Sequence, residues 1–128
     1  MFHVEQINQS IDFIENVSYG ADKLGFSFPE EILGKFAIYY DELCRWDRSI
    51  NLTGLRTDKE RIVLLFVDSL AGNLVLAGQP DGLIVDIGTG GGFPGIPLKL
   101  ALPAQHVLLM EPRANKIAFL HNIIGKLE

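Results

Sequence analysis

Cysteine is almost absent from this sequence, and the gaps in its composition exclude several classes of protein. Cys44 is the only cysteine among 128 residues, so no intrachain disulfide can form, and no Cys/His cluster has metal-site spacing. We expect Cys44 to be a small packed side chain. No apolar run approaches the roughly 20 residues of a membrane span, and the first ten residues lack the basic-then-apolar layout of a signal peptide. These absences predict a cytoplasmic protein with no metal site and no membrane partner.

Positive charge is also scarce. The chain has 11 Lys and Arg against 16 Asp and Glu, for a net charge of −5. The chain as a whole therefore has no general electrostatic attraction to nucleic acid. Segment 45–61 differs from the rest, because it holds five basic and three acidic residues, whereas segment 1–44 holds two basic and eight acidic. Segment 45–61 is the only locally basic part of the chain.

The first part of the chain is expected to be helical, because its apolar residues recur at helical spacing. The first helix covers about residues 4–14 and is broken at Tyr19-Gly20-Ala21. The second follows a start signal in which Ser27 caps the helix and acidic residues 30–31 lie in its first turn, and it ends near Asp47. The aromatic side chains of this helix lie on one face, which indicates a core rather than a base-stacking surface.

A third helix, capped by Thr57 or Asp58, is expected to continue to about Ala71. A turn cluster rich in glycine and proline then separates a helical region, residues 1–80, from a strand-helix region, residues 81–128. Hydrophobic residues make up 48% of the sequence, enough to bury a core, and the length fits one domain. Alternation of strands and helices in the second region predicts the α/β class.

The stretch 83–98 organises the rest of the chain. Leu83–Ile87 is a short β-branched run interrupted only by Asp86, as in a strand buried on both faces of a parallel sheet. Apolar periodicity resumes after Pro94, a residue type suited to the first turn of a helix. Between strand and helix lie residues that can take positive φ and approach a ligand closely, namely Gly88, Gly90, Gly91 and Gly92. This layout aims backbone amides at a ligand at the carboxyl end of the strand.

Residue spacing around this turn favours S-adenosylmethionine over a dinucleotide. A dinucleotide fingerprint needs glycine at the sixth position counted from Gly88, where this chain has Phe93. Asp86 would repel a pyrophosphate and favour a ligand that carries an ammonium or sulfonium group. Residues 106–110 are expected to form the next buried strand, and Glu111 follows it where an acidic side chain can accept hydrogen bonds from ribose hydroxyls. The alternatives are a nicotinamide or flavin module, and a plain tight turn flanked by solvated acids.

Three segments of the chain resemble one bacterial family. Residues 36–55 resemble its Y-x-x-L-x-x-W-N-x-x-x-N-L-T segment, residues 68–70 its D-S-L segment, and residues 86–98 its D-x-G-T-G-x-G-F-P-G-I-P-L segment. The chain is therefore identified as a member of the glucose-inhibited division protein B family, S-adenosylmethionine-dependent methyltransferases of 16S ribosomal RNA. The resemblance covers about residues 30–128, and its glycine motif is far more specific than a glycine turn alone.

The resemblance implies methylation of guanine N7 on a doubly wound, Rossmann-like methyltransferase sheet preceded by helices. S-adenosyl-L-methionine is the implied cofactor, and small-subunit ribosomal RNA or the 30S subunit is the implied partner. No catalytic acid or base is expected, because N7 has a free lone pair and alignment could suffice. By motif match, the cofactor-binding residues are Asp86, Gly88, Thr89, Gly90, Gly92, Phe93 and Glu111. Support from the helical half is expected from Asn51, Thr53 and Asp68. The candidates for RNA phosphate contacts are Arg45, Arg48, Arg56 and Lys116.

The chain departs from the family pattern at three points. Leu65 and Phe66 stand where the family has Arg-His, and Asn115-Lys116 stands where it has two basic residues. Family members also continue for several strands and helices beyond the position of Glu128. We therefore expect half a cofactor pocket, no methyl transfer by this truncated chain alone, and a homodimer through exposed sheet edges. The alternative is a non-catalytic fragment that folds and self-associates.

Overall fold

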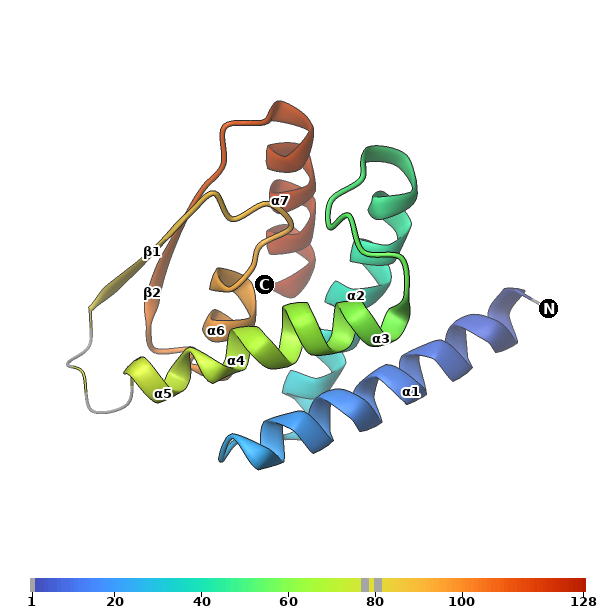
Figure 1. Cartoon of the computed structure of the whole chain (residues 1–128), viewed down its shortest axis with the longest axis horizontal. Helices are drawn as coiled ribbons and strands as arrows, with labels where there is room; N and C mark the ends of the chain where they lie inside the picture. Colours follow the sequence, from blue (N-terminus) through green and yellow to red (C-terminus); the bar gives the residue numbers. More distant parts are fainter. Residues whose placement is uncertain (1, 77–78, 80–81) are drawn as a thin grey trace.

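The structure, a computed structural model, describes residues 2–76, 79 and 82–128, and it has an α/β architecture (Figure 1). Its elements, in chain order, are α1 (Phe2–Lys23), α2 (Glu30–Ile50), α3 (Asp58–Arg61), the π-helical segment η1 (Ile62–Val67), α4 (Asp68–Ala71), α5 (Asn73–Leu76), β1 (Leu83–Ile87), α6 (Gly95–Ala101), β2 (His106–Met110) and α7 (Ala114–Leu127). Helices come first and two strand-helix units follow, so the predicted fold class is confirmed. The predicted turn cluster at 78–82 lies mostly outside the described residues.

The sheet consists of β1 and β2, which pair in parallel with Leu83 opposite His106 and Ile87 opposite Met110. Figure 1 shows α6 and α7 between the strands and α2, so helices cover one face of the sheet. The opposite face is open and exposes apolar side chains, namely Leu83, Val85, Ile87, Leu108 and Met110. The prediction that both strands are buried on both faces is therefore wrong for the described residues. Asp86, which interrupts the apolar run, is instead the most buried residue of β1.

Helix α1 continues through Tyr19-Gly20-Ala21, where the sequence predicted a break. A Cβ on Gly20 would lie only 2.6 Å from Cγ2 of Val67 in η1, so glycine lets the two helices approach closely. Val17 and Ala21 are buried on the same side of α1. This packing offsets the cost of about 1 kcal/mol for glycine inside a helix. The predicted break is wrong because the packing partner of Gly20 is distant in the sequence.

Both ends of α2 differ from the prediction. Its N-cap is Pro29 without a side-chain hydrogen bond, so Ser27 does not cap it. At the other end the helix reaches Ile50 rather than stopping near Asp47, and Asn51 closes it in the left-handed conformation, with φ of 51°. Asparagine is one of the few residues other than glycine that take this conformation readily.

The third helical run begins and ends as predicted. Thr57 accepts a hydrogen bond from the amide of Glu60, while the Glu60 carboxylate accepts one from the amide of Thr57, which completes a capping box. The run then passes through η1 and ends at Ala71. Its π-helical middle has no counterpart in the prediction, because apolar spacing does not distinguish a π turn from an α turn.

Aromatic side chains of the helices form the core, as predicted for α2. Phe36 and Tyr39 of α2 have no exposed surface. Phe66 of η1 lies at the centre, and its ring meets at steep angles the rings of Phe13, Phe36, Tyr39, Tyr40 and Phe93. Because Phe93 comes from the glycine turn, the aromatic core joins the helical half to the strand half.

Candidate functional site

The glycine turn lies at the carboxyl ends of the two parallel strands. The amides of Gly88 and Thr89 both donate to the carbonyl of Met110, at 2.8 and 3.1 Å, so the turn is attached to the end of β2 as well as to β1. Further along, the amide of Phe93 donates to the Thr89 carbonyl at 3.1 Å. In open α/β sheets, ligands bind at this end of the strands.

Asp86 braces the turn from the inside. Its Oδ2 accepts a hydrogen bond from Thr89 Oγ1 at 2.6 Å and another from the Gly95 amide at 2.9 Å, and the residue is only 8% exposed. This carboxylate therefore connects the end of β1, the middle of the turn and the start of α6. The structure places Asp86 and Thr89 at the turn, where the sequence predicted them, and their contact with a cofactor stays a prediction.

Glu111 reaches the same turn from the end of β2. Its Oε2 accepts a hydrogen bond from the Gly90 amide at 2.9 Å, and its Oε1 accepts one from the Arg113 amide at 3.1 Å. The amides of Arg113 and Gly90 lower the pKa of Glu111 below its ordinary value, so the carboxylate is charged at neutral pH. The structure thus brings both predicted acids to one glycine turn.

Two glycines early in the turn are open, whereas Gly92 and the first residue of α6, Gly95, are packed. Gly88 and Gly90 have φ of 73° and 60°, and a Cβ on either would meet no atom within 4 Å. A Cβ on Gly92 would lie 2.5 Å from Ile96 Cδ1, and a Cβ on Gly95 would collide with Leu109. The first half of the turn therefore faces open space, whereas the second half packs against the core.

Phe93 points into the aromatic core. Its ring stacks on Tyr39 with centroids 5.2 Å apart and planes 17° apart, and it meets Phe66 at 5.0 Å and 76°. Sequence reasoning selected this residue but gave it the role of lining the cofactor, which stays a prediction. Tyr39, which the sequence placed only in the core, also contacts the turn, because its hydroxyl donates to the carbonyl of Gly91.

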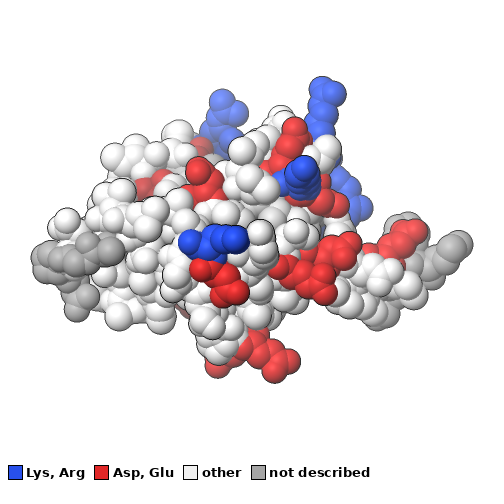
Figure 2. Space-filling view, turned by 60° about the horizontal axis from the view of Figure 1, so that its bottom comes forward, with Lys and Arg blue, Asp and Glu red and all other residues white. Residues whose placement is uncertain are grey.

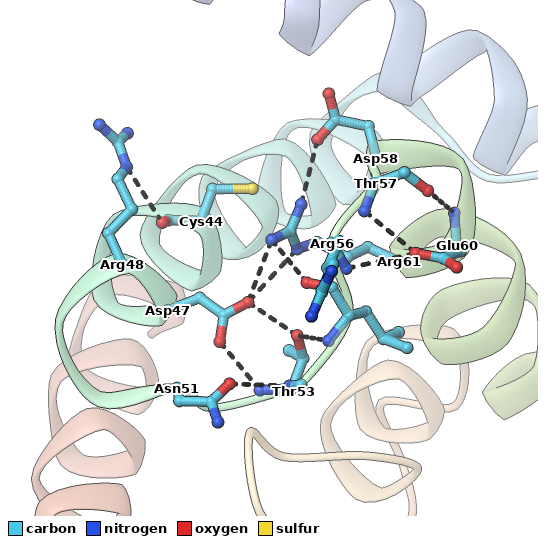
Figure 3. Close-up of polar contacts among 12 residues, drawn as sticks. Cys44, Asp47, Arg48, Asn51, Thr53, Arg56, Thr57, Asp58, Glu60 and Arg61 are labelled. Carbon is cyan, nitrogen blue, oxygen red and sulfur yellow. Dashed lines mark hydrogen bonds and ion pairs between the residues drawn. The ribbon is translucent and has the colours of Figure 1, made fainter.

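A second polar cluster closes the loop between α2 and α3 (Figure 3). Asp47 accepts hydrogen bonds from the amide and hydroxyl of Thr53, at 2.9 and 2.7 Å, and pairs with Arg61 at 3.2 Å. Arg61 also donates to the Leu55 carbonyl at 2.9 Å. Burial raises the pKa of Asp47, but the Thr53 hydrogen bonds and the Arg61 guanidinium outweigh this effect and hold it below its ordinary value.

The predicted support residues do not join the glycine turn through hydrogen bonds in the described part of the chain. Thr53 belongs to the cluster around Asp47, and Asn51 accepts a hydrogen bond from the Gly54 amide. Asp68 is exposed on α4. The sequence placed Arg61 only in the basic segment 45–61. It did not predict that Arg61 connects Asp47 to the Leu55 carbonyl.

The four candidate RNA-contacting residues lie in different surroundings. Arg45 pairs with Asp41 and Glu42, at 3.5 and 3.1 Å. Arg48 donates to the Cys44 carbonyl, and its guanidinium points away from the polar cluster (Figure 3). Arg56 is exposed on the loop before α3. Lys116 lies close enough to Glu111 to lower the pKa of that carboxyl.

Charge is unevenly spread over the surface. Figure 2 shows the face that carries α1, where acidic side chains lie across the middle and at the lower edge, and basic side chains lie mainly in the upper half. Within the described ranges, no group of three or more His, Cys, Asp or Glu side chains could hold a metal ion. No helix in the same ranges is long and apolar enough to cross a bilayer.

Residues 32–128, which include the glycine turn and both of its acids, match the family described as GidB, rRNA small subunit methyltransferase G. The chain belongs to this family. It is 35% identical over 116 residues to ribosomal RNA small subunit methyltransferase G of Acinetobacter baylyi, and 40% identical over 104 residues to the protein of the same name from Geotalea uraniireducens. These alignments cover 91% and 81% of the chain. The family predicted from the glycine motif is confirmed.

The alignments also show a difference in length. They cover 53% of the Acinetobacter baylyi protein and 47% of the Geotalea uraniireducens protein. The chain therefore spans about half the length of the curated relatives it matches.

Proposed function

We propose that the glycine turn binds S-adenosyl-L-methionine, and that this chain serves methylation of a guanine at N7 in small-subunit ribosomal RNA. Residues 81–128 carry the cofactor contacts in this proposal, and residues 1–80 support them. One observation carries it: the turn that contains the open glycines Gly88 and Gly90 hydrogen-bonds to two carboxylates, those of Asp86 and Glu111. Family membership supplies the type of reaction.

The residues of the turn fit this cofactor. Gly88 and Gly90 leave room for a ligand to approach the backbone. The carboxylate of Asp86 suits the ammonium or sulfonium group, and that of Glu111 suits ribose hydroxyls. A dinucleotide fits less well, because Phe93 occupies the position of the third glycine and its ring lies in the core.

When bound, the cofactor supplies a methyl group made electrophilic by its sulfonium. The residues of this chain would bind it and hold its methyl group in a fixed direction. Guanine N7 has no proton to lose, so neither Asp86 nor Glu111 is required as a general base. We therefore assign both acids to binding and orientation, and none to proton transfer.

Isothermal titration tests the cofactor assignment directly. The 128-residue chain is titrated with S-adenosylhomocysteine and, separately, with NAD. Heat with the first ligand alone is the expected result. Heat with NAD alone would contradict the methyltransferase proposal and favour a nicotinamide-binding module. No heat with either ligand would indicate that the chain is a folded but non-catalytic unit.

Methyl transfer by this chain alone is not expected. The described residues form a sheet of two strands, and they provide the side of the site that holds the methionine and ribose ends of the cofactor. Transfer requires the sulfonium, the methyl group and N7 to be held nearly in line. The test is incorporation of radiolabelled methyl into undermethylated small ribosomal subunits, with a full-length relative as positive control. Label at guanine N7 from the 128-residue chain would contradict this expectation.

Self-association is a second proposal, and the open face of the sheet favours it. Val85, Ile87 and Leu108 are 45%, 78% and 48% exposed, and each described strand pairs on only one edge. Unpaired edges with apolar side chains promote pairing between chains. We expect a second copy to pair here, so light scattering should give at least the mass of a dimer at micromolar concentration. A monomer under these conditions would exclude this interface.

A further inference from the structure

We propose that Tyr39 is a positioning residue for the cofactor turn. Through its hydroxyl, helix α2 fixes the backbone of Gly91 and thereby the shape of the open surface at Gly88 and Gly90. The inference rests on the proposed function, because it assumes that this surface receives the cofactor. It adds a residue from the helical half to a site otherwise built from the strand half.

The hydroxyl of Tyr39 is a fixed donor to the turn. The side chain is completely buried, and its hydroxyl donates to the carbonyl of Gly91, 52 residues further along the chain. Burial, and after it the negative charge of Asp86, raise the pKa of Tyr39 well above its ordinary value. The hydroxyl therefore keeps its proton at neutral pH and can donate it to the Gly91 carbonyl.

Three consecutive residues of the turn are adapted to this side chain. Gly91 presents its carbonyl to the hydroxyl. Gly92 has φ of 100°, and a Cβ there would lie 2.7 Å from the hydroxyl oxygen of Tyr39. Phe93 stacks on the ring of Tyr39. Tyr39 thus contacts the Gly91 carbonyl and the Phe93 ring, and the absence of a side chain at Gly92 leaves room for its hydroxyl.

The turn is consequently held from two sides. Asp86 and Glu111 hold it from the strands, through Thr89, Gly95 and Gly90. Tyr39 holds it from helix α2, through Gly91. A phenylalanine at position 39 would keep the ring and remove only the donor, which leaves a buried carbonyl without a partner. The backbone would then shift toward another donor, and the open glycines would move with it.

Tyr40 provides a matched control on the same helix. Its hydroxyl donates to the carboxylate of Asp58, and its ring stacks on Phe13 with centroids 4.2 Å apart. Replacing Tyr40 by phenylalanine also removes one hydroxyl and one hydrogen bond. That hydrogen bond, however, joins α2 to α3 rather than to the glycine turn.

The experiment compares the wild-type chain with Tyr39→Phe and Tyr40→Phe. S-adenosylhomocysteine affinity is measured by titration, and stability by urea unfolding. We expect Tyr39→Phe to weaken binding roughly tenfold, which is the effect of about one hydrogen bond, whereas Tyr40→Phe keeps wild-type affinity despite its own loss of stability. Wild-type affinity in Tyr39→Phe, or equal weakening in both variants, would overturn the proposal.

A measurement without ligand separates this inference from the proposed function. The amides of Gly92 and Phe93 both donate to the Thr89 carbonyl, at 3.0 and 3.1 Å, so their hydrogen exchange reports on the turn. Tyr39→Phe should accelerate exchange of these two amides roughly tenfold relative to wild type, and Tyr40→Phe should not. If the wild type binds no cofactor, the proposed function fails, while unchanged exchange in Tyr39→Phe would show that the tyrosine does not hold the turn.

Discussion

Two turns in this molecule are each closed by one carboxylate, and they differ in charge. Asp47 accepts hydrogen bonds from the amide and hydroxyl of Thr53 and also pairs with Arg61, 3.2 Å away. Asp86 accepts hydrogen bonds from the hydroxyl of Thr89 and the amide of Gly95. Among the residues that the structure describes, no cation pairs with Asp86. The Asp47 carboxylate is thus paired with a cation of the chain, whereas the described donors to the Asp86 carboxylate are neutral.

We infer from this difference that the turn at Asp47 is structural and that the turn at Asp86 binds a ligand. A buried charge is costly unless it is paired, so a carboxylate held only by neutral donors gains when a cationic ligand arrives. Asp47 already has its cation and has little left to offer a ligand. Asp86 is held by neutral donors within the described ranges, and we infer that an ammonium or sulfonium group of the ligand supplies its cationic partner.

The largest expected effect is that of Asp86→Asn on cofactor affinity. The amide oxygen of asparagine can still accept the hydrogen bonds from Thr89 and Gly95, so the variant removes charge more than geometry. A hydrogen bond to a charged group contributes about 1.5–3 kcal/mol, so S-adenosylmethionine should bind at least roughly tenfold more weakly, as measured by titration. Asp47→Asn is the control and should keep wild-type affinity. Unchanged binding in a folded Asp86→Asn protein would remove the contrast between the two turns.

Asp47→Asn should affect stability instead. It weakens two hydrogen bonds and leaves the partly buried Arg61 with only its longer ion pair to Asp58, at 3.6 Å, so we expect a loss of about 2–3 kcal/mol in urea unfolding at pH 7. The folded-state pKa of Asp47 is lowered, so its contribution is complete above the unfolded value of about 3.9 and is lost as pH falls through the folded value. Wild type and variant should therefore converge in stability as the pH falls below about 4. A constant difference down to pH 2 would contradict this account.

Alanine substitutions in the glycine turn should distinguish its open half from its packed half. Gly90→Ala meets only the strain of positive φ, about 1–2 kcal/mol, and adds a methyl group to the open surface. Gly92→Ala, at φ of 100°, has at least this strain and also collides with Ile96 and with the hydroxyl of Tyr39. We expect Gly92→Ala to lower the free energy of unfolding by about 1 kcal/mol more than Gly90→Ala. Equal stability of the two variants would show that the turn has no packed half.

Local patterns in the sequence were sufficient to predict the strands, the glycine turn and its two acids. They act over a few residues: β1 is a short apolar run, and the capping box at Thr57 is completed within three positions. Features that depend on distant residues were not predictable in this way. Helix α1 continues through Gly20 because Val67 packs there, and the roles of Tyr39 and Arg61 depend on Gly91 and Asp47.

The motif spacing that identified Phe93 as a site residue does not show which way its side chain points. A residue after four glycines can face either a ligand or the core, and its neighbours in sequence do not decide between them. The decision comes from the aromatic rings of Tyr39 and Phe66, which lie 54 and 27 positions earlier in the sequence. The residue types at a site are therefore easier to predict from sequence than whether each side chain faces the ligand or the core.

The smallest expected effect extends the comparison to the arginines near the end of α2. Arg45 pairs with Asp41 and Glu42, whereas Arg48 pairs with no carboxylate among the described residues and donates to the Cys44 carbonyl, so its charge remains available. We propose that Arg48 contacts a phosphate of ribosomal RNA. Arg48→Ala should then weaken binding to a small-subunit rRNA fragment less than tenfold and reduce the slope of log affinity against log salt by about 1.

Arg45→Ala is the matched control for this arginine, because it removes the same side chain from the same helix. Its two acidic partners already neutralise much of its charge, so the salt slope should change less than in Arg48→Ala. Filter binding at several salt concentrations measures both slopes. Equal slopes for the two variants would mean that pairing within the chain does not decide which arginine meets RNA, and a slope unchanged from wild type in Arg48→Ala would exclude its phosphate contact.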